Sequence, residues 1–465
     1  MNNKWSELGW TCLDSIRSAQ LLTRLNASLA WATTTVSLAR LDAPLWYPED
    51  TDIMVRPIDK MILEASLLAL IAGRCEDART AAKDLMQEVA KHTEVASRLY
   101  ELIRRRPHLR TSIGLLWVAL DSFDCGDADQ RISMRELWQS EPFPAQPHER
   151  SPYRLLDQAW VRSKAKGEVD PVIATGALVP FTSLGNLDGA PFMPRNDLYA
   201  LTHTAMYITD FGEWSQPDTY SSEVIGGITL SRLMEGDFDL AAELALADVL
   251  VGDQACNGTQ VAVRAVLNDV FDAIGRIPSP SFEQSDYDCA VDQDTYLRFH
   301  SYHTTFVYAL LCYGILRDQN RQSLKWEPAL STFEERYWHP SEMTSISNPI
   351  SNLSALVAKH TQEWTAACIA RGVPFNEDET DLLRSVLDGH LVHAVQNDQV
   401  DDILQLLSMS GIAGQSQIDR LVRKHISQRA RLARSCKNDK VLAEKVATDF
   451  ERSALVPQLQ SAQVS

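Results

Sequence analysis

Two short stretches of the chain carry histidine, tyrosine and aspartate at spacings that suit acid–base or metal chemistry. The first is residues 197–212, DLYALTHTAMYITDFG, and the second is residues 296–308, YLRFHSYHTTFVY. Together they hold three of the eleven histidines of the chain. Because imidazole is the commonest metal ligand and the commonest general base near neutral pH, the sequence places the candidate site here.

The first stretch predicts a helix with one polar aromatic face. Tyr199, His203 and Tyr207 follow one another at intervals of four residues and therefore share a face. Asp210 follows His203 by seven residues, which adds roughly 10 Å of helical rise and is too far for both to chelate one metal ion. This face, which begins near Arg195, is interpreted as the wall of a polar pocket.

The second stretch places His300 and His303 three residues apart, so that on a helix they can point together and share one ion. With His203 they would make a three-nitrogen set, which is a known kind of open catalytic zinc site. Asp210, Asp253 or Asp294 could replace one member of that set. Two alternatives stay open: a metal-free pocket doing acid–base chemistry or binding, and histidines that only hold helices together.

The residues of both stretches can be given roles in a single site. His203 or His303 is the candidate general base, Asp210 its orienting partner, and Tyr207 and Tyr302 are hydrogen-bond donors. Arg195 or Arg298 would anchor a substrate carboxylate or phosphate. The full candidate set is His203, Tyr207, Asp210, His300 and His303 for catalysis, Arg195, Tyr199, Arg298 and Tyr302 for substrate binding, and His203, His300 and His303 for a divalent transition metal such as zinc.

The elements that must position these residues are predicted to be helices. Apolar residues recur at helical spacing over residues 59–72, 221–234 and 382–395, and each run is followed by a short Gly, Asn or Asp turn and a second run with acidic residues in its first turn. These patterns predict antiparallel helical hairpins. The last hairpin contains His390 and His393, whose amphipathic surroundings favour a structural role. The expected fold is all-α, curved into an α/α-toroid or a helical-repeat solenoid.

Proline-rich stretches suggest how the chain is divided. Residues 141–152 and 338–349 cannot sustain a helix, because proline lacks a donor and restricts the residue before it. The predicted regions are therefore 1–150 (N-terminal, helical), 151–338 (central, carrying the candidate site) and 339–465 (C-terminal, helical).

Composition excludes several classes of function. A formal net charge of −18 argues against a nucleic-acid binder, which needs a basic surface. The eight cysteines form no CxxC pair, so a zinc ribbon or a thioredoxin-like motif is excluded. The N-terminus lacks the pattern of a signal peptide, and no apolar run approaches the roughly 20 residues of a membrane span. We expect a cytoplasmic protein without a membrane or nucleic-acid partner.

The segments LTHT and TDFG of the first stretch, followed downstream by FHSYHTT, resemble a bacterial family of proteins of unassigned function over about residues 170–320. The resemblance implies a bacterial origin and one shared site for the two stretches, and it assigns no catalytic role. Helical hairpins facing a central pocket also look like the α/α-toroid of terpenoid cyclases, protein prenyltransferases and lanthionine cyclases. The chain lacks their QW repeat, DxDD motif and Cys/Cys/His zinc set, so this likeness concerns architecture alone.

Two functions are consistent with these observations. The first is an enzyme acting on a small molecule or peptide, as in a biosynthetic pathway, with its site between the two histidine stretches. The second is a non-catalytic helical-repeat module that binds a peptide or a partner protein in its groove. The concentration of imidazole and polar aromatic groups on two helices favours the enzyme. The substrate, the reaction, the metal and the oligomeric state are not encoded in any motif of the sequence.

Overall fold

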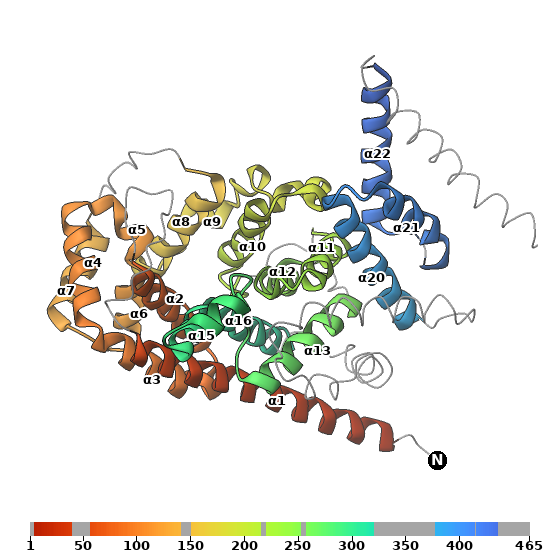
Figure 1. The fold of residues 1–465 in the computed structure, drawn as a ribbon. Coiled ribbons are helices and arrows are strands. Elements are labelled where there is room, and N and C mark those ends of the chain that lie inside the picture. Colours follow the sequence, from red (N-terminus) through yellow and green to blue (C-terminus); the bar gives the residue numbers. More distant parts are fainter. Residues whose placement is uncertain are drawn as a thin grey trace, which may run out of the picture.

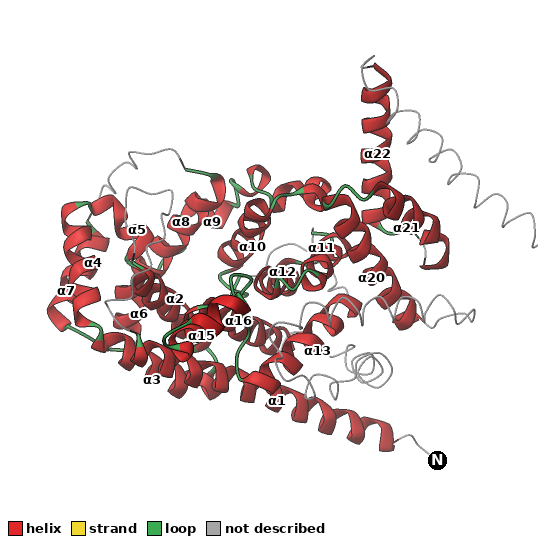
Figure 2. Ribbon diagram, viewed as in Figure 1, coloured by secondary structure: helices red, strands yellow, loops and turns green. Residues whose placement is uncertain are grey.

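The computed structural model describes residues 4–39, 56–140, 150–214, 220–252, 257–319, 377–413 and 415–435 (Figure 1). Within these ranges the chain forms helices joined by loops and contains no strand (Figure 2). The all-α prediction is confirmed. Curvature into a toroid or solenoid stays a prediction.

The helices have the following bounds. The α-helices are α1 (Lys4–Leu38), α2 (Pro57–Ala72), α3 (Arg79–Lys91), α4 (Thr93–Arg105), α5 (Arg110–Ile113), α6 (Leu115–Ser122), α7 (Ala128–Gln139), α8 (Pro152–Lys166), α9 (Pro171–Thr175), α10 (Arg195–Thr209), α11 (Ser222–Met234), α12 (Phe238–Val251), α13 (Asn257–Ile274), α14 (Gln284–Cys289), α15 (Gln293–Phe299), α16 (Tyr302–Gln319), α20 (Glu377–Gln396), α21 (Val400–Ala413) and α22 (Gln417–Ser435). The 3₁₀ helices are η1 (Glu76–Ala78), η2 (Pro107–Leu109), η3 (Val179–Phe181) and η4 (Leu184–Phe192).

The predicted helix pairs pack against each other. Helix α2 contacts α3, α11 contacts α12, and α20 contacts α21. The turn between α11 and α12 shows why the chain reverses there. Gly236 has φ of +72°, which costs a glycine little, and the Asp237 side chain then caps α12 by accepting a hydrogen bond from the backbone N–H of Leu240.

Helix α12 is the central element of the fold. Apart from three acidic residues, it is built of alanine, leucine, valine and phenylalanine, and residues 238–248 are buried throughout. It packs against α10, α11, α13 and α16 (Figure 1). A helix that is apolar on all sides is expected to lie inside a protein, so charged groups on α12 are placed in the interior.

One hydrophobic cluster runs through the three regions that the sequence predicts. It extends from Leu21 on α1 to Val422 on α22, α2 packs on α16, and α20 packs on α11. The proline-rich stretches expected to separate the regions lie outside the described residues, except for 150–152. The boundaries therefore stay predictions. None of the described helices combines the length and the apolar character needed to cross a membrane.

His390 on α20 gives the fold an expected dependence on pH. Burial, and then the nearby His393, lower the pKa of His390 to about 4, below the ~6.5 expected in an unfolded chain. Between these two values the unfolded chain binds a proton that the folded chain does not, so stability should fall as the pH drops from about 6.5 to 4.

We therefore expect His390→Gln to lose less stability than the wild type between pH 7 and pH 5, measured as the shift in the urea midpoint. Titratable groups that do not interact with His390 cancel in this comparison. An equal shift in the two proteins would mean that His390 is not the titrating group.

Candidate functional site

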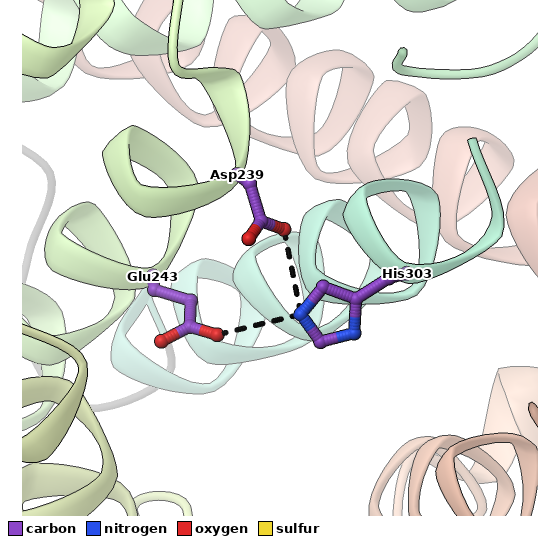
Figure 3. A group of neighbouring side chains, drawn as sticks. All are labelled: Asp239, Glu243 and His303. Carbon is purple, nitrogen blue, oxygen red and sulfur yellow. Dashed lines mark ion pairs between the residues drawn. The ribbon is translucent and has the colours of Figure 1, made fainter. Parts of the chain in front are cut away.

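His303 lies in the first turn of α16 and is surrounded by carboxylates. Its Nδ1 donates a hydrogen bond of 2.9 Å to Oε2 of Glu64 on α2. Its Nε2 lies 3.5 Å from Oδ1 of Asp239 and 3.8 Å from Oε1 of Glu243, both on α12 (Figure 3). We call Glu64, Asp239, Glu243 and His303 the carboxylate–imidazole cluster. It joins three helices that are far apart in the sequence.

The two acidic members of α12 share one face because they are four residues apart. Asp239 is 4% exposed and Glu243 is 2% exposed. Burial of a charged group costs free energy unless hydrogen bonds and counter-charges replace water. The packing of α12 thus holds two carboxylates in the interior, with one edge of each directed at His303.

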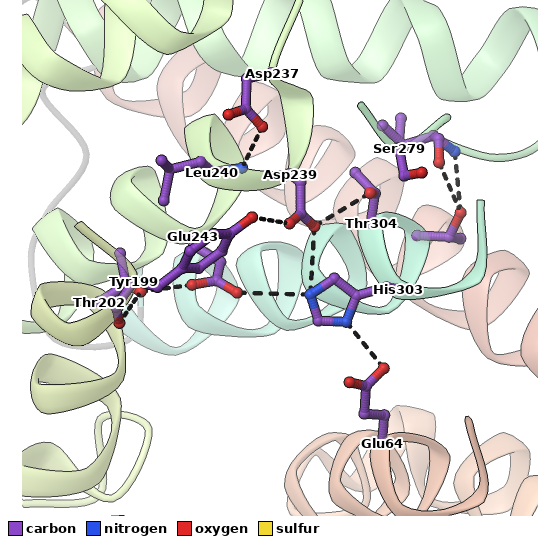
Figure 4. A network of polar contacts seen from close by, with 12 residues as sticks. Glu64, Tyr199, Thr202, Asp237, Asp239, Leu240, Glu243, Ser279, His303 and Thr304 are labelled. Atoms are coloured by element: carbon purple, nitrogen blue, oxygen red, sulfur yellow. Dashed lines mark hydrogen bonds and ion pairs between the residues drawn. The ribbon is translucent and has the colours of Figure 1, made fainter. Parts of the chain in front are cut away.

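Neighbouring hydroxyl groups satisfy the other lone pairs of these carboxylates (Figure 4). Tyr199 donates to Oδ2 of Asp239 over 2.6 Å, and Thr304 donates to Oδ1 over 3.1 Å. Thr202 donates to Oε2 of Glu243. Such hydrogen bonds fix the orientation of carboxylates in metal sites.

The electrostatics of the cluster favour a positive charge at its centre. Burial of the His303 ring by itself lowers its pKa. The charges of Glu64 and Asp239, the hydrogen bond to Glu64 and the charge of Glu243 have the opposite effect and are larger together, so the His303 pKa is raised to about 10. Burial raises the Glu64 pKa, but the charge and hydrogen bond of His303 lower it by more, so the Glu64 pKa lies below its ordinary value. In this state the ring keeps its proton at neutral pH.

The cluster also brings together side chains that could hold a metal ion. Among the described residues, one group of three potential ligands has atoms within 4.8 Å of one another, and it is Asp239, Glu243 and His303. Two atoms that bind one cation at ~2.1 Å lie about 3.0–3.4 Å apart, so small movements suffice. The hydrogen bond to Glu64 keeps the proton on Nδ1, so Nε2 could bind a metal that displaces its own proton, and this carboxylate–histidine–metal arrangement recurs in metalloproteins.

The site has an accessible edge. The side chains of His303 and His203 are 34% and 29% exposed, in contrast to the buried carboxylates between them. His203 projects from α10, with Nε2 lying 3.7 Å from Oε2 of Glu243. A ligand approaching from outside would therefore meet the two imidazole rings before the carboxylates.

Three tyrosine rings border His203. The centroids of Tyr153, Tyr199 and Tyr207 lie 6.1, 6.3 and 5.9 Å from that of the imidazole. The Tyr207 hydroxyl is hydrogen-bonded to Asp157, and burial, followed by the charge of Asp157, raises the Tyr207 pKa. The predicted polar aromatic face of α10 therefore lies beside the cluster, with Tyr199 in direct contact with Asp239.

Asp210 does not orient either histidine. It ends α10 with φ of +51°, and its buried carboxylate accepts hydrogen bonds from Arg74 (2.9 Å), Trp160 (2.8 Å) and Lys164. Arg74 also donates to the Asp210 backbone carbonyl. The residue that does orient His303 is Glu64, so the contacts of Asp210 point to a structural role that joins three parts of the chain.

His300 also lies apart from the cluster. It ends α15, its Nδ1 is 3.0 Å from the Ser281 hydroxyl, and its ring lies 4.2 Å from that of Tyr296. The three histidines are not a group of ligand atoms within 4.8 Å of one another in the described residues. A loop between α15 and α16 breaks the helix that would have let His300 and His303 point together.

The remaining candidate residues have other partners. Arg195 is paired with Asp237 and donates to the Tyr199 hydroxyl over 2.8 Å. It therefore contacts the cluster only through Tyr199, which donates to Asp239. Arg298 is paired with Asp294 over 2.8 Å. Tyr302 is buried against Phe299 and Phe306 in the core. Asp253, an alternative ligand, lies outside the described residues.

Sequence reasoning missed three of the four members of the cluster: Glu64, Asp239 and Glu243. For the last two a signal exists, because two acids four residues apart interrupt an otherwise apolar helix, FDLAAELALADVLV. Such acids are expected to be buried and to need a partner. Glu64 carries no comparable signal, since its contact with His303 joins residues 239 positions apart.

Comparison with known proteins assigns the chain to a family whose function is unknown. Residues 25–313, more than half of the chain, match the model of a domain of unknown function, DUF6895. The chain belongs to the DUF6895 family. The carboxylate–imidazole cluster and His203 lie inside the DUF6895 match, and helices α20, α21 and α22 lie beyond it. No curated protein and no solved structure matches the chain significantly.

Proposed function

We propose that this DUF6895 protein is a metal-dependent enzyme acting on a small molecule or a peptide. Asp239, Glu243 and His303 hold a divalent transition-metal ion, and Glu64 orients the imidazole. One observation carries the proposal: two buried carboxylates and a partly exposed imidazole place three ligand atoms within 4.8 Å. Imidazole and carboxylate together suit zinc, manganese or iron.

The chemistry that follows is activation of water. Three protein ligands would leave coordination positions for water and substrate, and a divalent ion held there would supply an activated water near neutral pH. The accessible edge at His303 and His203 is where the substrate would enter. Hydrolysis of a carbonyl or phosphoryl compound is the reaction class that this arrangement supports best. A bacterial, cytoplasmic enzyme with its helical hairpins curved into a toroid remains our expectation.

The HxxH spacing of the second stretch provides a matched test. We expect the wild type to bind close to one equivalent of zinc or manganese, His303→Ala to bind none, and His300→Ala to bind like the wild type. His300 is the control because its ring contacts Tyr296 and Ser281 and not the cluster. Metal content is measured by elemental analysis after loading and dialysis, and folding by circular dichroism.

A wild type that retains no metal would contradict the proposal and favour the alternative, a non-catalytic module that binds a peptide or partner protein. Loss of metal in both histidine variants would show that the ion does not bind at His303 Nε2. If metal is bound as expected, the loaded wild type and His303→Ala should then be compared on a panel of peptide, ester and phosphoester substrates.

A further inference from the structure

The two oxygens of Glu243 face different imidazole rings. Oε1 lies 3.8 Å from Nε2 of His303 on α16, and Oε2 lies 3.7 Å from Nε2 of His203 on α10. A cation bound by both oxygens of one carboxylate sits in front of them, at about equal distances. Each oxygen of Glu243 therefore faces one imidazole, although the group of ligand atoms within 4.8 Å of one another contains His303 and not His203.

His203 makes no hydrogen bond among the described residues, although its charge interacts with the Asp157 carboxyl. Its Nδ1 is buried without a hydrogen-bond partner, and its Nε2 has no hydrogen bond among the described residues. Nε2, the atom that faces Glu243, therefore has no hydrogen bond to the described residues that a ligand would have to replace. The ring is nevertheless held in place, because Tyr153, Tyr199 and Tyr207 border it.

Helix α10 is tied to the same carboxylates by other contacts. Tyr199 donates to Asp239, and Thr202 donates to Glu243. These residues flank His203 on its own helix, so the backbone that carries the ring is fixed relative to the ligands on α12. Coordination by His203 would therefore need its side chain, and not its helix, to move toward the ligands on α12.

From these contacts we infer that His203 is the fourth residue of the metal centre and that Glu243 chelates the cation through both oxygens. This inference rests on the proposed function. The complete set is two imidazoles and two carboxylates, with Glu243 supplying two donor atoms. It selects manganese, iron, cobalt or zinc over magnesium and calcium, which prefer oxygen ligands alone.

Cobalt(II) binding tests the assignment, because the visible spectrum of cobalt(II) reports its ligands. We expect His203→Ala to bind cobalt(II) at least tenfold more weakly than the wild type and with a shifted spectrum. His303→Ala should bind none, and His300→Ala should reproduce the wild-type spectrum. Added imidazole should restore the wild-type spectrum to His203→Ala.

X-ray absorption of the zinc-loaded wild type gives a second measurement that needs no substitution, so it holds even if His203→Ala fails to fold. We expect two coordinated imidazoles. One imidazole, or a His203→Ala spectrum and affinity equal to those of the wild type, would overturn the role of His203 while leaving the metal centre intact. A wild type that binds neither cobalt nor zinc would overturn the proposed function and this inference together.

Discussion

Glu243→Gln is expected to weaken divalent-metal binding by two orders of magnitude or more while the chain stays folded. Glutamine keeps the shape of glutamate, and its carbonyl can still accept the hydrogen bond from Thr202. It removes the negative charge that lies next to both His303 and His203. A hundredfold loss corresponds to about 2.7 kcal/mol of binding free energy.

Isothermal titration with zinc or manganese measures this effect, and Glu101→Gln is the matched control. Glu101 is 48% exposed and its side chain is paired with Arg104 on the surface. That variant should bind metal like the wild type. Equal affinity in Glu243→Gln and the wild type would remove Glu243 from the centre, whereas a general loss of folding would appear in the circular dichroism of the metal-free protein.

Asp210→Ala is expected to destabilise the protein by about 3 kcal/mol, which is the lower end of the cost of breaking a buried ion pair. The lower end applies because Arg74 and Lys164 are 19% and 21% exposed and regain some hydration. The substitution also leaves the Trp160 indole N–H without its acceptor. The positive φ at this position adds a further cost, because the left-handed conformation is unfavourable for alanine.

A series of substitutions at Asp210 separates the loss of its buried ion pairs from the backbone strain at its positive φ. Asp210→Asn should be the mildest, because asparagine tolerates the left-handed conformation and can still accept from Trp160. Asp210→Gly should destabilise the protein more than Asp210→Asn and less than Asp210→Ala, because glycine tolerates the positive φ but still lacks the carboxylate. Urea unfolding measures the series, and Asp188→Ala, at a residue that is 66% exposed, is the control. A change below about 0.5 kcal/mol in Asp210→Ala, typical of a surface position, would contradict the structural role.

Local patterns in the sequence predicted the elements of this fold well. The apolar repeat of residues 221–234, the turn at Gly236 and the acidic start of the next run correspond to α11 and α12. Hydrophobic periodicity and turn chemistry act over a few residues, so they can be read without knowing the rest of the chain. The same reasoning placed Tyr199 and His203 on one face of α10, where both reach the cluster.

The identity of the site depended on contacts that no local pattern contains. His300 and His303 have the spacing of a shared ligand pair, but a break between α15 and α16 directs them to different surroundings. The sequence predicts Asp210 as a catalytic partner because it follows His203 by seven residues on one helix, but in the structure its carboxylate is bound by Arg74, Trp160 and Lys164.

By itself, the sequence determined that the chain is helical and that His203 and His303 belong to polar surroundings. The tertiary structure decided which carboxylates meet them. Glu64 comes from α2 and Asp239 and Glu243 from α12, and only the packing of α2 and α12 on α16 brings the three acids to one imidazole. The physical reason is that the charge and ligand geometry of a site depend on distances in space, which helix periodicity does not specify between separate helices.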